Sequence, residues 1–174
     1  MSRCAARVGC LGLALFALAC AGPSNTTEQV QVATRTRFEL VSGVLGARCG
    51  SLDCHGQVGR SLRIYSQLGL RQDADDYPGL EAGIVSETEV EANFRAATTL
   101  EPEIMAAVVS DQGRNPERLT LVRKARGSED HKGGQAIVTG STSDRCILSW
   151  LASDVDDSAC TEGALVVRPD APLP

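Results

Sequence analysis

The sequence predicts a mainly α-helical domain of about five helices joined by long irregular loops. Apolar residues recur every three or four positions in several segments, as they do on the buried face of a helix. Ser or Pro stands at the start of most of these segments, where each residue type favours a helix N-terminus. Alternating patterns typical of strands are short and few. The fold class is therefore mainly α, with at most one short strand.

The first expected helix runs from about Arg37 to Arg48, with Phe38 and Val41 on its apolar stripe. The pattern between residues 56 and 77 is ambiguous, and no element is assigned there. Ser86 and Glu89 form a capping box, which predicts a helix to about residue 98. The next helices are expected from Pro102 to near 113, from Pro116 to before 127, and from Ser141, paired with Asp144, to about 152. The rest is expected to be polar loop, apart from a possible strand at 165–167.

The N-terminus has the pattern of a bacterial export signal. Arg3 and Arg7 precede an apolar run that is too short to span a membrane. The stretch 17–20 resembles a lipobox, which implies acylation of Cys20 and an exported lipoprotein on the periplasmic side or the cell surface. An ordinary signal peptide cut near residue 21 or 22 is the alternative.

Four regions are expected along the chain. They are a lipoprotein-type signal peptide (1–19), a flexible tether (20–36), one domain (37–153) and a polar, Pro-rich tail (154–174). The formal net charge of −5 argues against nucleic acid as a partner. The membrane is expected to be reached only through the N-terminal lipid.

Seven cysteines are an odd number for an exported chain, so at least one thiol needs a separate role. Cys4 and Cys10 leave with the signal, and Cys20 is the expected lipid attachment site. Two close pairs remain. We expect Cys146 and Cys160 to form a disulfide that fastens the tail to the last helix, and a loop of this size stabilises by about 3 kcal/mol.

The other pair belongs to the densest chemical motif, Cys49-Gly-Ser-Leu-Asp-Cys54-His55-Gly56. Covalent attachment of haem needs two thiols for the two vinyl groups and an adjacent imidazole for the iron. The usual spacing between the thiols is two residues, whereas it is four here. A plain disulfide between Cys49 and Cys54 is therefore an equal alternative on this motif alone.

Two further blocks accompany the motif at ordered positions. Residues 121–134 read LVRKARGSEDHKGG, and the last helix contains LSWL at 148–151. Together the three blocks resemble the cytochrome c-like domains of planctomycete and myxobacterial exported proteins, some of which carry a Cys-x4-Cys-His motif. The likeness covers about residues 37–152. It implies a cytochrome c-like fold, haem c bound through Cys49 and Cys54, and His55 as the proximal iron ligand.

His131 is the leading candidate for the sixth ligand, because it is the only other histidine and lies in a glycine-rich loop. A histidine in a polar loop that ligates nothing is the alternative. Met105 is a less favoured axial ligand, since its helical neighbours predict a core position. Lys124 and Lys132 are more remote candidates, because an ammonium must first lose its proton.

Zinc is a rival for Cys49, Cys54, His55 and His131, which supply four nitrogen and sulfur ligands. The adjacency of Cys54 and His55 argues against it, because neighbouring side chains point in different directions. A hydrolase is disfavoured, since neither histidine lies in a recognisable nucleophile motif.

The expected function is that of a membrane-anchored c-type cytochrome, which carries single electrons to or from a periplasmic or membrane redox protein and is not an enzyme. The alternative is a haem-free lipoprotein, stapled by disulfides, with a binding or structural role. The aromatic content of 3% favours the alternative slightly, because few aromatic side chains remain to line a haem pocket.

Overall fold

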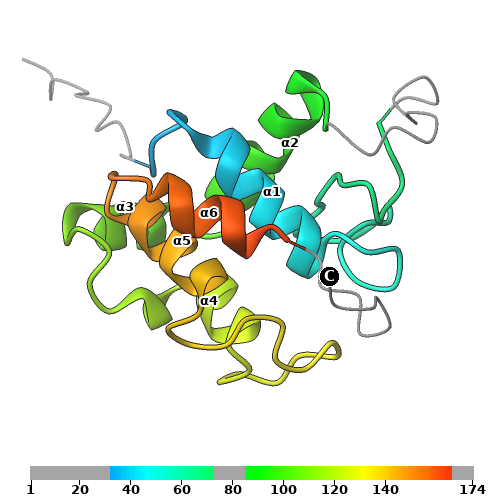
Figure 1. Cartoon of the computed structure of the whole chain (residues 1–174). Coiled ribbons are helices and arrows are strands. Elements are labelled where there is room, and N and C mark those ends of the chain that lie inside the picture. The colour runs from blue at the N-terminus through cyan, green and yellow to red at the C-terminus, as the bar shows by residue number, and fades with distance from the viewer. Residues whose placement is uncertain (1–31, 73–84, 166–174) are drawn as a thin grey trace, which may run out of the picture.

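The computed structural model describes residues 32–72 and 85–165. Its elements are α1 (Phe38–Cys49), α2 (Glu87–Thr98), α3 (Pro102–Ser110), the 3-10 turn η2 (Pro116–Arg118), α4 (Thr120–Ala125), α5 (Thr142–Leu151) and α6 (Asp157–Gly163) (Figure 1). Six α-helices and no strand occur in these ranges, which confirms the mainly α class. Within the same ranges no helix has the length and apolarity needed to cross a membrane. The expected signal peptide, Cys20 and most of the tether lie outside the described residues.

The core forms where α1 crosses α2, α5 and α6. Phe38, at the start of α1, is fully buried and contacts two other rings, Phe94 of α2 and Trp150 of α5, each at a centroid distance of 5.1 Å. Such tilted or edge-to-face pairs stabilise beyond the area that they bury. Three of the four aromatic residues in the described ranges therefore gather near the N-terminal end of α1, which leaves its C-terminal end for other side chains.

Helix starts follow the local signals. Ser86 and Glu89 make both hydrogen bonds of a capping box at α2, and the Ser141 hydroxyl accepts from the backbone of Asp144 at α5. Pro102 occupies the first turn of α3. The helix expected from Pro116 is divided, because Leu119 is extended and its side chain is buried between η2 and α4.

Two parts of the expected boundaries are wrong. Residues after 152 include helix α6, whose Cys160 is bonded to Cys146 of α5 as the sequence predicts. The last residues of the expected tether belong to the domain, because Ala33 is 1% exposed and the carbonyl of Thr34 accepts from Trp150 Nε1 at 2.8 Å. Leu165 is not in a strand, and residues 166 and 167 lie outside the description.

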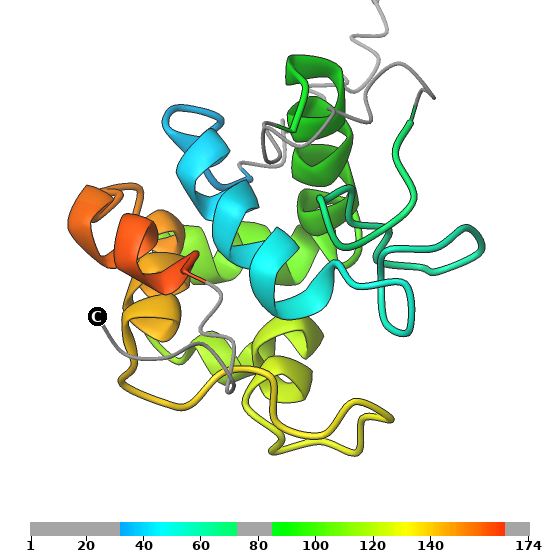
Figure 2. The same ribbon diagram turned by 45° about the vertical axis from the view of Figure 1, so that its right-hand side comes forward.

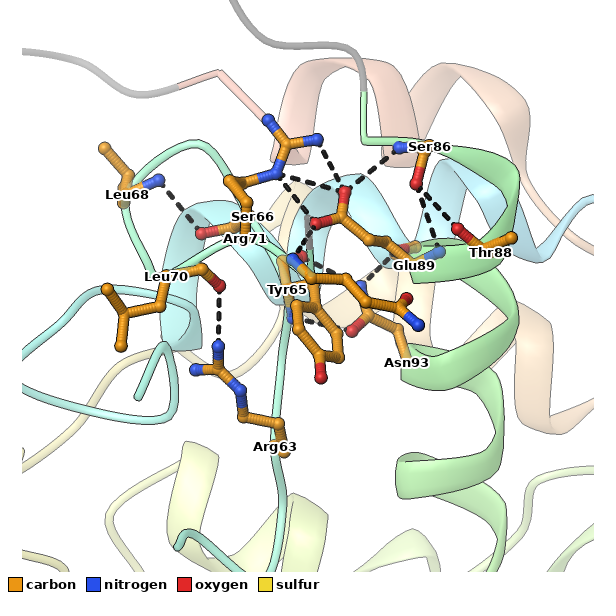
Figure 3. A network of polar contacts seen from close by, with 12 residues as sticks. Arg63, Tyr65, Ser66, Leu68, Leu70, Arg71, Ser86, Thr88, Glu89 and Asn93 are labelled. Carbon is orange, nitrogen blue, oxygen red and sulfur yellow. Dashed lines mark hydrogen bonds and ion pairs between the residues drawn. The ribbon is translucent and has the colours of Figure 1, made fainter. Parts of the chain in front are cut away.

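The segment that follows α1, residues 50–72, has no regular structure but is attached firmly to α2. Arg71 and Glu89 form a buried ion pair with side chains 1% and 0% exposed, and Glu89 also accepts from the backbone of Gln72 (Figure 3). Asn93 pairs with both backbone groups of Tyr65. These side chains bond backbone groups that would otherwise be paired in a helix or a sheet. The segment therefore has a defined path although it has no regular secondary structure.

Candidate functional site

The motif after α1 folds into a closed loop that brings its two ends together. The backbone N–H of His55 donates to the carbonyl of Cys49 at 2.9 Å, six residues back. Inside this loop, Cys54 N and Gly56 N both donate to the carbonyl of Ser51, at 3.0 and 2.8 Å. Of the four residues between the cysteines, Leu52 and Asp53 are exposed, while Gly50 is buried. The longer spacing still places Cys54 and His55 beside Cys49.

Three glycines make this close folding possible. A Cβ atom on Gly56 would lie 2.1 Å from the carbonyl oxygen of Gly50, and one on Gly69 would lie 2.6 Å from the same oxygen. No side chain fits at such distances. The glycine that follows His55 is thus required by the packing of backbone against backbone beneath the motif.

His55 is held in one tautomer. Its Nδ1 lies 2.7 Å from the carbonyl oxygen of Leu62, which only accepts, so Nδ1 carries the proton and Nε2 keeps its lone pair. Its own carbonyl accepts from Ile64 N at 2.9 Å. Burial lowers the pKa of His55 below its ordinary value, the nearby His131 and Arg60 lower it further, and the Leu62 bond opposes them. The imidazole is therefore neutral at neutral pH and able to bind a metal.

His131 comes to the same place from the loop between α4 and α5. The two imidazole rings have centroids 5.7 Å apart and planes inclined by 17°. The Nδ1 of His131 lies 3.4 Å from the carbonyl oxygen of Gly134. As in His55, it is Nδ1 and not Nε2 that faces a backbone carbonyl. A Cβ on Gly133 would lie 3.9 Å from Cys54 Sγ. The structure thus brings together the two histidines that the sequence singles out.

A cavity of about 620 Å³ joins these residues. Cys49, Cys54, His55 and His131 all line it. Its remaining wall is largely apolar, with Leu62, Leu100, Leu121, Ala125 and Ala136, and it carries the cations Arg60, Lys124 and Lys132. The loops that follow α1 and α4 lie on one side of the helical body (Figure 2). The volume of the cavity lies in the range of pockets that bind small ligands.

The two thiols of the motif are free, in contrast to the bonded pair at Cys146 and Cys160. Cys49 is buried at the end of α1, and Cys54 is partly buried. Burial raises the pKa of the Cys49 thiol to about 12, the neighbouring Cys54 raises it as well, and Arg48 opposes both. The sequence allowed a Cys49–Cys54 disulfide as an alternative, and the structure does not contain this bond.

The other candidate ligands differ in whether they line the cavity. Met105 is 1% exposed within the hydrophobic core and does not line the cavity, which confirms its expected core role. Lys124 and Lys132 do line it, but Lys124 pairs with Glu129 at 2.9 Å. Among the described residues no group of three or more His, Cys, Asp or Glu side chains is arranged to hold a metal ion. This finding covers the set of four residues for which zinc was the disfavoured alternative, Cys49, Cys54, His55 and His131.

Comparisons with known proteins provide no family for this chain. A scan against family models, a search of curated proteins and a search of solved structures gave no significant match.

Sequence reasoning missed several residues that shape the site. The carbonyl of Leu62 fixes the His55 tautomer, and no side-chain pattern indicates such a role for a backbone oxygen. Arg60 lines the cavity from a polar loop, where its sequence context is that of any exposed arginine. Gly69 was also missed, because its packing against Gly50 depends on the path of the loop and not on local sequence.

Proposed function

We propose that this protein is a c-type cytochrome that carries single electrons. Haem would be attached through thioether bonds to Cys49 and Cys54, with His55 and His131 as the two axial ligands. One observation carries the proposal: two imidazoles from separate loops lie across one cavity, and both free thiols lie on its wall. Haem supplies the redox chemistry, since its iron alternates between the ferrous and ferric states.

The distance between the two rings is compatible with a shared metal ion. Centroids 5.7 Å apart lie within the about 4.5–7 Å of ordinary aromatic ring pairs, so the spacing fits a shared ion but does not require one. A metal–nitrogen bond is about 2.0–2.1 Å long, so one ion is within reach of two nitrogens that are about 4 Å apart. The contacts of Nδ1 in both rings leave Nε2 as the ligating atom. Two imidazole nitrogen ligands fit haem iron.

The cavity wall fits the remainder of a haem. Its apolar side chains, Leu62, Leu121 and Ala125 among them, would suit the faces of a porphyrin. Arg60, Lys124 and Lys132 would supply positive charge for the two propionate groups, although the Asp53 carboxylate also lines the cavity. The free thiols are in the reduced form that addition to vinyl groups requires.

The cellular setting is part of the same proposal. Cys20 would carry a lipid that anchors the domain to a bacterial membrane, and a periplasmic or membrane redox protein would exchange electrons with it. No substrate bond is made or broken in this function, so the protein is not an enzyme. The net charge of −5 does not suit nucleic acid as a partner.

Expression in a host with cytochrome c maturation tests the proposal. We expect the protein to show the Soret band of a bound porphyrin. We also expect it to stain for haem on a denaturing gel, because thioether bonds survive denaturation. The variant with Cys49→Ser and Cys54→Ser should lose the stained band. Absence of covalent haem from the wild-type chain would contradict the proposal and favour the haem-free lipoprotein.

A further inference from the structure

A second cavity, of about 490 Å³, runs along α1 and shares no lining residue with the first. We call it the α1 groove. Leu68, Val85 and Val90 form its apolar walls. Most of the α1 residues that line it have small side chains, namely Ser42, Gly43, Gly46 and Ala47. Because no bulky side chain of α1 fills this space, the groove has room for another segment of chain.

The two hydroxyl groups that line the α1 groove are already bonded to the protein. The Ser42 hydroxyl accepts from Asn93 Nδ2 at 2.9 Å, and the Ser66 hydroxyl donates to the carbonyl of Gly50 at 2.8 Å. An apolar segment can therefore cover both hydroxyl groups without leaving either of them unsatisfied.

Glu39, in the first turn of α1, is the one charged residue among those that line the groove. Its side chain is 52% exposed and lies 3.8 Å from Arg35, which also pairs with Glu87 and Glu91. Three carboxylates thus share this guanidinium, although Arg95 also pairs with Glu91. The groove is apolar along α1 and acidic at the end near residue 39. This pattern suits a segment in which a cation follows apolar residues.

The described part of the chain ends at this groove. Leu165 lines the groove and is 61% exposed, and its carbonyl accepts from Arg48 Nη2 at 3.2 Å. Ala164 also lines the groove, and a Cβ on Gly43 would lie 3.5 Å from the Ala164 Cβ. The residues that follow are Val166-Val167-Arg168-Pro169, and Arg168 is the only cation in 166–174. Both the β-branched valines and the residue before a proline favour an extended backbone.

The length of this segment matches the length of the groove. From Ala47 to Glu39 the groove follows eight residues of α1, about 12 Å at 1.5 Å per residue. Three extended residues beyond Leu165 span about 10 Å. A segment that runs from Leu165 toward the start of α1 therefore places its two valines over the small side chains and its arginine beside Glu39.

We propose that residues 166–168 dock in the α1 groove, with Val166 and Val167 against its apolar walls and Arg168 paired with Glu39. Docking would cover Leu165, whose carbonyl is bonded to Arg48. The C-terminal segment would then act as a strap that holds the end of α1 where Cys49 lies. This inference does not depend on haem, and its test gives a result whether or not haem is attached.

Photo-cross-linking of the full chain tests the occupant of the groove directly. A photoreactive benzoylphenylalanine replaces Val167, the protein is irradiated, and tryptic peptides are mapped by mass. We expect the main link to join position 167 to the peptide 38–48, which contains the α1 side of the groove. Links to residues 73–84 or to a second copy of the chain, or links spread over the surface, would overturn the inference.

A charge reversal tests the pairing with Arg168. Glu39→Lys should lower the yield of this link by about two- to fivefold, as expected for a partly exposed ion pair. Glu103→Lys is the matched control, because Glu103 is exposed on α3 and lines neither cavity. It should leave the yield unchanged. Equal yields in the two variants would show that Glu39 does not bind the segment and would contradict the proposed pairing.

Urea unfolding tests the docking without the bulky probe. Val166→Asp together with Val167→Asp places two charges in the apolar part of the groove and should lower the unfolding midpoint by about 0.5 M or more. Ala171→Asp together with Leu173→Asp is the control, because it adds the same charges beyond the reach of the groove, and it should leave the midpoint unchanged. Equal midpoints for the two double variants would overturn the inference.

Discussion

The two cysteine pairs of the domain have opposite states although both are close in sequence. Cys146 and Cys160 lie on adjacent helices and form a disulfide. Cys49 and Cys54 lie at the two ends of a tight loop and remain free thiols. The first pair joins two helices that pack against each other, and the second pair lines a cavity that two imidazoles also line.

This difference separates a structural bridge from a pair of thiols left free beside the cavity. The bonded pair supports α6, and the carbonyl of Gly163 at the end of α6 accepts from Arg48, the residue before Cys49. The bonded pair thereby supports the end of α1, where Cys49 lies. The four predictions that follow test this division, beginning with the largest expected effect.

The largest effect is expected in thiol labelling of protein made without haem. The thiolate is the reactive form, and the pKa of about 12 keeps Cys49 almost wholly protonated. Iodoacetamide at pH 8 should label Cys54 at least about a hundredfold faster than Cys49, as read by peptide mass. In denaturant both should react at similar rates. Equal rates in the folded protein, or a Cys49–Cys54 disulfide, would contradict the account.

Removal of the structural bridge should cost about 3 kcal/mol of unfolding free energy. The variant with Cys146→Ser and Cys160→Ser is compared with the wild type by urea denaturation. Wild type in a reducing agent is the control and should approach the stability of the variant. A loss below about 1 kcal/mol would mean that the bridge has little part in holding α6.

Gly56→Ala should destabilise the domain by about 1–3 kcal/mol, because the added methyl group would lie 2.1 Å from the carbonyl of Gly50. Gly43→Ala is the matched control within α1, where the new methyl group makes an ordinary contact of 3.5 Å. The control should be stabilising by about 0.5–1 kcal/mol. Equal behaviour of the two variants in thermal melts would refute the tight folding of the motif.

The smallest effect concerns pH. Since the pKa of His55 is lowered in the folded chain, the unfolded chain takes up a proton first as the pH falls below about 6.5. The stability of haem-free protein should therefore decrease from that pH downward until the folded pKa is passed. His55→Gln should lack this part of the pH dependence. Stability curves that are parallel for the two proteins between pH 7 and 5 would contradict this.

The sequence predicts the helices correctly where the signals lie within a few neighbouring residues. The stripe on α1 predicts that helix to within one residue at each end, and Ser86 and Ser141 mark two helix starts correctly. The cysteine spacing predicts the bridge between Cys146 and Cys160. Each of these rests on residues within one helix or on a single pair.

Local reasoning failed where distant contacts decide. α6 consists of small and polar residues, and the disulfide and its packing against α1 and α5 stabilise it. Asp156, which caps α6, was an available signal. The irregular segment after α1 follows a path set by the pairing of Arg71 with Glu89, which no local pattern indicates. The states of Cys49 and Cys54 likewise depend on that folded path.

The most direct test of the account is the mass of one tryptic peptide. Cleavage after Arg48 and Arg60 releases residues 49–60, which contain both free cysteines and His55. For protein made in a host with cytochrome c maturation, we expect this peptide to be heavier by the mass of one haem. An unmodified peptide, or one lighter by two hydrogens because a disulfide has formed, would contradict the proposed cytochrome.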